Sequence, residues 1–300
     1  MRVAFLGSPD EAVTALRAVV AAGHDVVLVV TQPDRRRRRS APPEPTPVHR
    51  AATELGLPVV TPERAVEVGS RLRASGAEIG IVVAYGRILP EEALAALPGG
   101  LVNVHFSLLP RWRGAAPVER ALLAGDAETG VCLMRVDAGL DTGPVFARTV
   151  VPVDADDTAG TLRSRLAEAG AHLLVERLPS LPGLVPEPQV GAATAAPKLS
   201  IDEFRIDPYR DDAIAVDRIV RAGDPRPGAW MVVGAERVKV LRAAVAGGPG
   251  PEPGRIDGNG VLGTRSGAVV LVEVRPEGRR AMTGGAFVAG RGGTAIVGGA

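Results

Sequence analysis

Residues 101–146 read LVNVHFSLLPRWRGAAPVERALLAGDAETGVCLMRVDAGLDTGPVF and combine the pattern of an α/β sheet with a dense group of polar side chains. An apolar run at residues 100–104 predicts a strand, and residues 117–124 predict the helix that follows it. Two further runs, 131–136 and 144–153, flank a glycine-bordered loop and predict an antiparallel pair at the sheet edge. This stretch therefore predicts a strand, a helix and a strand pair around one polar centre.

The hundred residues before this stretch alternate between strand and helix patterns. Continuous apolar runs, most of them rich in β-branched residues, predict strands at residues 2–6, 26–30, 59–60 and 79–83. Segments with helical patterns lie after or between them, at residues 12–20, 48–55, 62–74 and 91–97. This order predicts an α/β fold with a parallel sheet, in which ligands collect at the carboxyl ends of the strands.

The second half of the chain changes to an all-β pattern. A helix at residues 158–178 ends the first part, and residues 186–199 have the aperiodic composition of a linker. From Trp230 onward, short alternating runs predict a small barrel of about five strands, and the uncharged tail at 292–300 predicts disorder. We therefore expect a first domain at residues 1–185, a linker at 186–205 and a second domain at 206–300.

Composition limits the classes of protein to be considered. A chain of 300 residues with 46% hydrophobic content can fill two cores, and a net charge of +1 neither requires nor excludes a nucleic acid partner. The single cysteine, Cys132, excludes an intramolecular disulfide framework and leaves too few soft ligands for a structural zinc site. No run of about 18 uncharged apolar residues occurs, and acidic residues follow the first strand at once, so we expect a cytoplasmic protein without a signal peptide or membrane span.

Asn103 and His105 are the first candidates for chemistry. Residues two apart on a strand point to the same side, so these side chains can share a target. An amide donor beside an imidazole suits the stabilisation of an oxyanion and the transfer of a proton in acyl-group transfer. An isolated Asn and His two residues apart are more often structural, with the Asn capping the strand end and the His packed beside it. The surrounding residues must therefore decide between the two interpretations.

Asp137 and Asp141 lie in the glycine-bordered loop DAGLDTG. Aspartates in such loops usually form Asx turns. The alternative is that one of the two lies against His105, where it would raise the pKa of the imidazole and orient it. Both interpretations stay open at the level of the sequence.

The run of five arginines at residues 35–39 is the strongest local charge in the chain. Such runs are usually solvated, and this one lacks aromatic residues that would stack on bases. A basic loop beside an active site can instead bind phosphates. Residues 227–300 carry nine basic and five acidic residues, which is mildly basic. The turn Gly7-Ser8-Pro9 after the first strand does not match GxGxxG, and the motifs GxxxxGK[ST], HExxH and GxSxG are absent from the chain.

Several motifs together resemble one enzyme family. The central matches are NVHFSLLPRWRGAAP at residues 103–117, GD at 125–126, ETG at 128–130 and DAGLDTG at 137–143. Further matches are TQPD at 31–34, VAYGRILP at 83–90, APKL at 196–199, PGAW at 227–230 and RPEGRRAM at 275–282. They resemble the 10-formyltetrahydrofolate-dependent formyltransferase family, and within it the methionyl-tRNA formyltransferases, over almost the whole chain.

The resemblance implies a Rossmann-like formyltransferase domain, an OB-like C-terminal barrel that contacts tRNA, and a role for each matched residue. The catalytic residues would be Asn103, His105 and Asp141, with Asn103 and His105 holding the oxyanion and Asp141 keeping His105 charged or assisting proton transfer. The folate-binding residues would be Ser107, Leu108, Leu109, Pro110, Ile88, Leu89 and Val136. The residues expected to contact tRNA are Arg35, Arg36, Arg37, Arg38, Arg39 and Lys239. We expect 10-formyltetrahydrofolate as formyl donor, initiator methionyl-tRNA as acceptor, no metal and a monomer.

Three positions depart from the family pattern. Glu11 stands where the family has an aromatic residue implicated in holding the methionyl side chain, and residues 35–45 lack the usual glycines. An expected aromatic residue is also absent near residues 223–227. Two alternatives therefore remain for the function: a folate-dependent N-formyltransferase acting on an amino sugar or another small amine, and a non-catalytic tRNA-binding paralogue.

Overall fold

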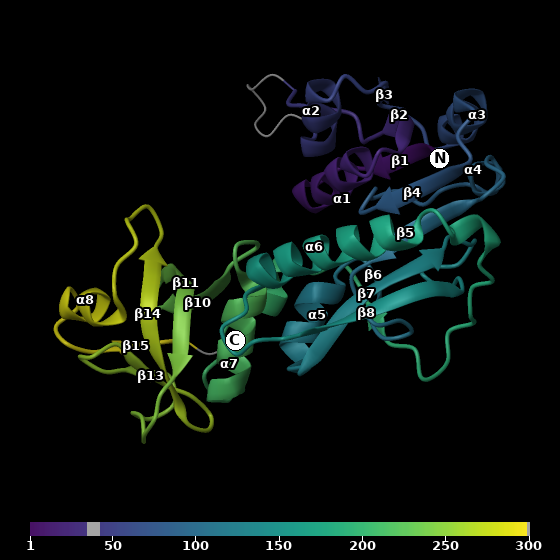
Figure 1. Ribbon diagram of the computed structural model, residues 1–300. Helices are drawn as coiled ribbons and strands as arrows, with labels where there is room; N and C mark the ends of the chain where they lie inside the picture. Colours follow the sequence, from purple (N-terminus) through teal and green to yellow (C-terminus); the bar gives the residue numbers. More distant parts are fainter. Residues whose placement is uncertain (35–42, 299–300) are drawn as a thin grey trace. The chain divides into compact units, whose positions relative to one another are not determined.

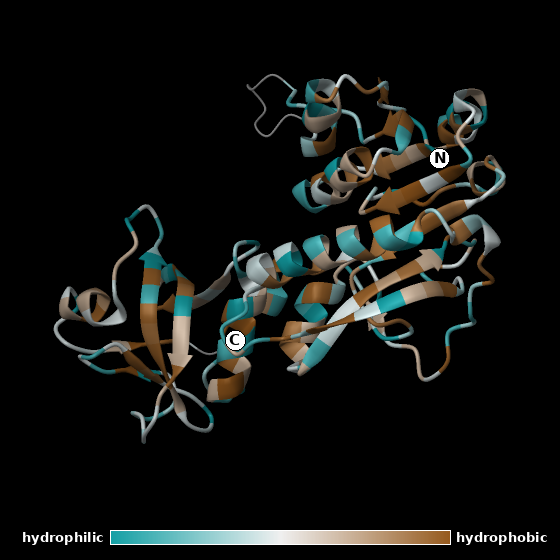
Figure 2. Ribbon diagram, viewed as in Figure 1, coloured by the Kyte–Doolittle hydropathy of each residue, from teal (hydrophilic) through white to brown (hydrophobic). Residues whose placement is uncertain are grey.

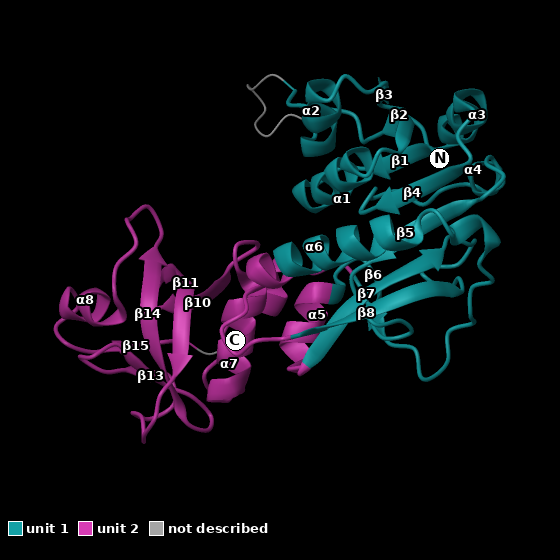
Figure 3. Ribbon diagram, in the orientation of Figure 1, with its two compact units in different colours: residues 1–117, 128–152, 163–197 teal, residues 118–127, 153–162, 198–300 magenta. Residues whose placement is uncertain are grey.

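A computed structural model describes residues 1–34 and 43–298 (Figure 1). The chain divides into two compact units (Figure 3). The first comprises residues 1–117, 128–152 and 163–197, and the second comprises residues 118–127, 153–162 and 198–300. The domain boundaries given above stay a prediction.

A seven-stranded sheet in the order β3-β2-β1-β4-β5-β7-β8 forms the centre of the first unit. The strands are β1 (Arg2–Gly7), β2 (Asp25–Val30), β3 (Val59–Val60), β4 (Ile79–Val83), β5 (Leu101–His105), β7 (Glu128–Arg135) and β8 (Val145–Pro152). Neighbouring strands from β3 to β5 are parallel, whereas β7 and β8 add two antiparallel strands at one edge. The predicted parallel sheet with an antiparallel strand pair at its edge is therefore confirmed.

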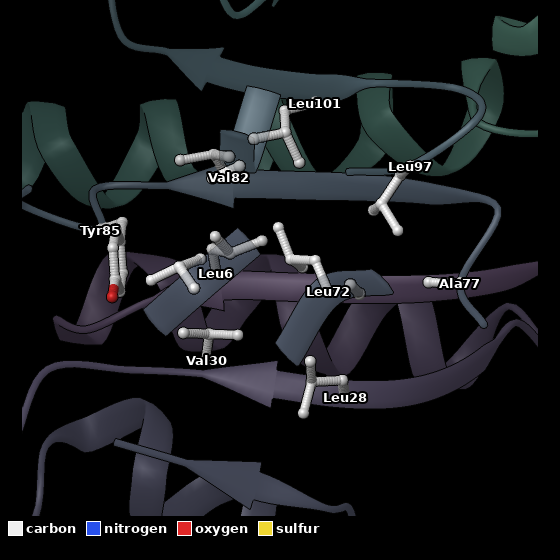
Figure 4. Packing of buried hydrophobic residues seen from close by; sticks show 12 residues of the cluster. Leu6, Leu28, Val30, Leu72, Ala77, Val82, Tyr85, Leu97 and Leu101 are labelled. Atoms are coloured by element: carbon white, nitrogen blue, oxygen red, sulfur yellow. The ribbon is translucent and has the colours of Figure 1, made fainter. Parts of the chain in front are cut away.

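Helices cover both faces of this sheet because its strands are apolar on both sides (Figure 2). They are α1 (Asp10–Ala21), α2 (Pro47–Glu54), α3 (Val66–Ser75), α4 (Glu91–Leu94) and α6 (Ala159–Arg177). On the face of α3 and α4, Leu72 packs with Leu6, Val82 and Leu101 in one buried cluster (Figure 4). The helix α6 lies so close to β5 that a Cβ on Gly170 would come within 2.9 Å of Val104. This packing covers Val104, one residue from the carboxyl end of β5.

The second unit contains a six-stranded antiparallel sheet in the order β10-β11-β14-β13-β12-β15. Its strands are β10 (Ala229–Val233), β11 (Glu236–Val245), β12 (Arg255–Ile256), β13 (Val261–Gly263), β14 (Ala268–Pro276) and β15 (Ala295–Ile296). Its helices are α5 (Pro117–Ala124), α7 (Ala213–Gly223), α8 (Gly284–Ala289) and the 3-10 turn η2 (Ile201–Phe204).

The two edges of this sheet meet, as expected of a small barrel. Val233 at the end of β10 forms a bridge with Val297, and the amide of Gly298 donates to the carbonyl of Val232 at 2.9 Å. The sequence predicted about five strands and a disordered tail, whereas residues 295–296 form a sixth strand. Residues 295–298 are ordered because their backbone groups pair with β10 and β12.

Part of the expected linker, up to residue 197, belongs to the first unit and pairs with its strands. Glu187 pairs with Val145 through two backbone hydrogen bonds of 2.8 and 2.9 Å. Further along, β9 (Ala195–Ala196) pairs in parallel with β6 (Arg113–Gly114). A Cβ on Gly114 would lie 2.5 Å from the carbonyl oxygen of Ala196, so this pairing requires glycine there. We call residues 187–196 the strap; the 3-10 turn η1 (Leu181–Gly183) precedes it. In the described part of the chain, no helix is long and apolar enough to span a membrane.

Candidate active site

His105 is the last residue of β5 and is buried, with 5% of its surface exposed. Its Nε2 lies 3.0 Å from the carbonyl oxygen of Trp112, and its Nδ1 lies 3.7 Å from Oδ2 of Asp141. Because a carbonyl can only accept a hydrogen bond, we assign the proton of the neutral imidazole to Nε2. The neutral ring then presents a lone pair at Nδ1, on the side of Asp141.

Asn103 lies two residues before His105 on the same strand, so both side chains project from one face of the sheet. The strand holds it firmly, because Asn103 is in register with Val82 of β4 and Met134 of β7. It is half-buried, and its carboxamide has no hydrogen-bond partner within residues 1–34 and 43–298. Its NH2 group is therefore free to donate to a ligand beside His105.

Asp141 is the aspartate of the loop that contacts His105. Its Oδ2 accepts a hydrogen bond of 2.8 Å from the amide of Gly114, and its side chain is 16% exposed. Asp137 instead accepts from the amide of Gly139 and from Thr142 within the loop, as an Asx-turn residue does. The tertiary structure thus separates two aspartates that the sequence left equivalent.

Both partners of His105 have strained backbones. The φ angle is +62° at Trp112 and +53° at Asp141, in the left-handed region. Aspartate tolerates this conformation better than most residues, but for tryptophan it is a clear outlier. Such positions cost about 1–3 kcal/mol each and concentrate at functional sites, where the surrounding structure enforces them.

Burial lowers the pKa of His105 below its ordinary value of 6.5. The carboxylate of Asp141 and the hydrogen bond to Trp112 act in the opposite direction, but burial has the larger effect. The aspartate therefore does raise the pKa of the imidazole as the sequence suggested, yet the net shift is downward. The imidazole is neutral at pH 7, with its lone pair ready to accept a proton.

We expect a titration of His105, followed by NMR of histidine-labelled protein, to give a midpoint below 6.5. Since the folded pKa is depressed, the neutral ring persists as the pH falls below 6.5 and is lost only at the lower, folded pKa. The unfolded chain binds the proton first, so this residue destabilises the fold progressively below about pH 6.5. The protein in urea provides the control, and a folded midpoint at or above the unfolded one would contradict the assignment.

Comparison with known proteins identifies the family. The family model for formyl transferase matches residues 1–178, and the model for the formyl transferase C-terminal domain matches residues 198–292. The chain belongs to the formyl transferase family.

Relatives of this formyl transferase are similar over almost their whole length. A methionyl-tRNA formyltransferase of Paracoccus denitrificans is 50% identical, with 94% of this chain and 95% of the relative covered. A methionyl-tRNA formyltransferase of Thermus thermophilus is 47% identical, with 97% of both chains covered. HypX of Aquifex aeolicus, solved with tetrahydrofolic acid, has the same fold, with a TM-score of 0.65 at 21% identity. The match covers 96% of this chain but only 47% of HypX.

The expected folate residues of the formyl transferase fall into two groups. Ser107 and Leu109 are buried: Ser107 Oγ donates to the carbonyl of Arg111 at 2.6 Å, and Leu109 packs in a small cluster with β7 and β8. Leu108 and Pro110 are half-buried. The turn at residues 107–111 is thus held from inside, while its half-buried residues are the ones that a ligand could contact.

The residues expected to line the pteridine ring lie beside the buried cluster that contains Leu72. Leu89 and Val136 are partly buried and pack against it. Ile88, next to Leu89, is 84% exposed, and Leu140, next to Asp141, is 65% exposed. These two large, exposed apolar side chains leave surface that a ligand ring could cover.

The expected tRNA contacts are only partly visible. Arg35, Arg36, Arg37, Arg38 and Arg39 lie outside the described residues. Lys239, on β11 of the second unit, is in register with Trp230 on β10 and Arg275 on β14. The guanidinium of Arg237 lies 3.9 Å from the centre of the Trp230 ring. These neighbouring cations and one aromatic ring are a surface suited to phosphates and bases.

Two further observations concern Glu11 and the capacity of the described residues to bind a metal ion. Glu11, which departs from the family pattern, forms an ion pair of 3.9 Å with Arg163 of α6. Among residues 1–34 and 43–298, no group of three or more His, Cys, Asp or Glu side chains is arranged to hold a metal ion. Gln189 and Thr194 could not be predicted as site residues, because the aperiodic segment that contains them has no motif apart from the neighbouring APKL match at residues 196–199.

Proposed function

We propose that this formyl transferase moves the formyl group of 10-formyltetrahydrofolate to the α-amino group of methionyl-initiator tRNA. The observation that carries the proposal is the 50% identity with a methionyl-tRNA formyltransferase over 94% of the chain. The arrangement of Asn103, His105 and Asp141 supports formyl transfer, because it combines a free amide donor with a neutral base and a carboxylate.

In the mechanism we infer, the role of each of the three residues follows from whether its side chain can donate or accept a proton. Attack of the amine on the formyl carbon forms a C–N bond and moves the carbonyl electron pair onto oxygen, where the carboxamide of Asn103 donates to it. His105 takes the amine proton at Nδ1, and Asp141 stabilises the resulting imidazolium. Only the protonated ring can donate to the oxyanion through Nδ1. The oxyanion pair then re-forms the C=O bond as the C–N10 bond breaks, and N10 takes the proton back from His105, which releases tetrahydrofolate and restores the neutral imidazole.

The exposed apolar residues support a place for the pteridine ring. Ile88 and Leu140 would cover its faces, with Leu89 and Val136 behind them. The half-buried Leu108 and Pro110 would complete the folate site, and buried Ser107 and Leu109 would hold their turn in shape. HypX, a protein of the same fold, binds tetrahydrofolic acid.

The proposal is tested by incubating the full-length protein with 10-formyltetrahydrofolate and, in parallel, methionyl-tRNA, a nucleotide-linked amino sugar or free small amines. We expect formylation of methionyl-tRNA alone. Turnover of an amino sugar or a free amine without turnover of the tRNA would replace methionyl-tRNA with that acceptor. Binding of the tRNA with no turnover of any acceptor would favour the non-catalytic alternative. The expectations of a metal-independent monomer are checked by assay in chelator and by sedimentation.

Replacing Arg35 to Arg39 with serine should weaken tRNA binding and flatten its salt dependence. Each phosphate contact that is lost lowers the slope of log affinity against log salt by about 0.7–0.9. Binding is measured by titration at several salt concentrations. A matched control replaces the exposed Arg64, Arg71 and Arg73 near or on α3, where we expect the slope to stay unchanged. Equal slopes for the loop variant and the parent would show that the arginines are merely solvated.

A further inference from the structure

The strap holds the peptide group that contacts His105. The amide of Trp112 donates to Oγ1 of Thr194 at 2.8 Å, and the amide of Arg113 donates to the carbonyl of Thr194 at 2.9 Å. Because the Arg113 amide and the Trp112 carbonyl belong to one peptide group, this bond fixes the direction of the carbonyl that accepts from His105 Nε2. The side chain and the backbone of Thr194 thus hold the two peptide groups on either side of Trp112, and the side-chain bond to the Trp112 amide is the one that a substitution of Thr194 can remove.

A second strap residue, Gln189, holds the other partner. Its Nε2 donates to the carbonyls of Asp141 and Gly143, each at 2.8 Å. Its Oε1 accepts from Nε and Nη2 of Arg113 at 3.0 and 2.7 Å. The carboxamide thus uses both donor and both acceptor positions, and it joins the Asp141 loop to the segment whose next residue, Gly114, binds the carboxylate of Asp141.

The backbone strain at the site gives an independent reason for such a support. In the described part of the chain, only three residues other than glycine have positive φ: Ala84, Trp112 and Asp141. The two of them that contact His105 are the two that the strap binds directly. Residues in this conformation persist when neighbouring contacts enforce it, and Thr194 and Gln189 supply those contacts.

We propose that the strap is a positioning element of the active site, in which Thr194 fixes Trp112 and Gln189 fixes Asp141 against His105. Neither side chain contacts a reacting group, so both act through the residues that they hold. The kinetic consequences rest on the proposed formyl transfer, whereas the structural consequence at His105 does not. The strap therefore supports catalysis, although its sequence has only the composition of a linker.

Kinetics of strap variants provide the first test. Gln189→Met and Thr194→Val keep the approximate size of each side chain and remove its hydrogen bonds, so we expect kcat for methionyl-tRNA to fall about 10- to 100-fold. The KM for 10-formyltetrahydrofolate should change less than about 3-fold, because neither variant replaces a residue that would contact folate. Thr194→Ser retains Oγ and should restore kcat. The control Val190→Gln alters a neighbouring strap residue that is 85% exposed and should resemble the parent.

The Gln189→Glu variant separates two possible functions of Gln189, which are to hold Arg113 and to hold the Asp141 loop. A carboxylate still accepts from Arg113 but cannot donate to the carbonyls of Asp141 and Gly143. If holding the Asp141 loop is the function, Gln189→Glu loses kcat as Gln189→Met does. A kcat equal to that of the parent would overturn the proposed role of Gln189.

The tautomer of His105 provides a test that does not depend on turnover. Nitrogen-15 NMR of histidine-labelled protein, with His105 assigned through His105→Gln, distinguishes a ring protonated at Nε2 from a mixture of tautomers. We expect the Nε2 tautomer in the parent and in Thr194→Ser, and a mixture in Thr194→Val. A pure Nε2 tautomer and a kcat within 2-fold of the parent in Thr194→Val, with its melting temperature retained, would overturn the proposal. If the parent formylates no methionyl-tRNA, the proposed function fails while the tautomer still tests the strap.

Discussion

We expect His105→Ala to lower kcat at least about 100-fold, which is the effect of removing a general base from acyl transfer. The neutral imidazole is the one group in the described site with a lone pair directed toward a carboxylate, so no other side chain can take the proton in the same place. Single-turnover formylation of methionyl-tRNA measures the chemical step directly.

The control for this variant is His172→Ala, because His172 is exposed on α6. His105 is buried, so its loss also leaves a cavity, and the melting temperature of each variant must accompany its rate. A rate within a few-fold of the parent in folded His105→Ala would remove the imidazole from the mechanism.

We expect Asp141→Asn to lower kcat to a similar extent, at least about 100-fold, with little change in the free energy of unfolding. The amide oxygen of asparagine can still accept from Gly114, and asparagine tolerates positive φ as aspartate does, so the loop keeps its shape. The substitution removes only the negative charge that stabilises the imidazolium. Asp141→Ala, which loses the charge and the hydrogen bond, should be at least as slow and also less stable.

Asp137→Asn is the matched control for the charge in this loop. Asp137 binds Gly139 and Thr142 inside the loop, and asparagine can replace it as an acceptor. We therefore expect its kcat to stay within a few-fold of the parent. Equal losses in Asp137→Asn and Asp141→Asn would mean that loop shape, and not the charge beside His105, limits the rate.

Local sequence pattern was sufficient for most of the fold. Continuous β-branched runs such as residues 26–30 and 79–83 form strands buried on both faces, because a parallel sheet covered by helices leaves no polar face. Short elements escaped the pattern, as the sixth barrel strand at Ala295–Ile296 shows. A strand of only two residues is too short to show a hydrophobic period in the sequence, and this one forms because it pairs with a distant segment.

The candidate site was predictable where the chemistry lies on one strand. The spacing of Asn103 and His105 places both on one face by strand geometry alone. The choice between Asp137 and Asp141 was not predictable, because the two differ only in how the loop folds back to Gly114. The family resemblance pointed to Asp141, and the tertiary structure supplies the contact.

The sequence by itself determined the order of strands and helices, the pairing of Asn103 with His105 on one strand, and membership of a formyl-transferring family. Only the tertiary structure decided the protonation of His105 and the support of its partners. The pKa of the imidazole follows from its burial, which no local pattern reports. The strap contacts join residues that are far apart in the chain: Gln189 and Asp141 are separated by 48 positions, and Thr194 and Trp112 by 82. Such contacts arise from chain closure in three dimensions, and a segment without periodicity carries no trace of them.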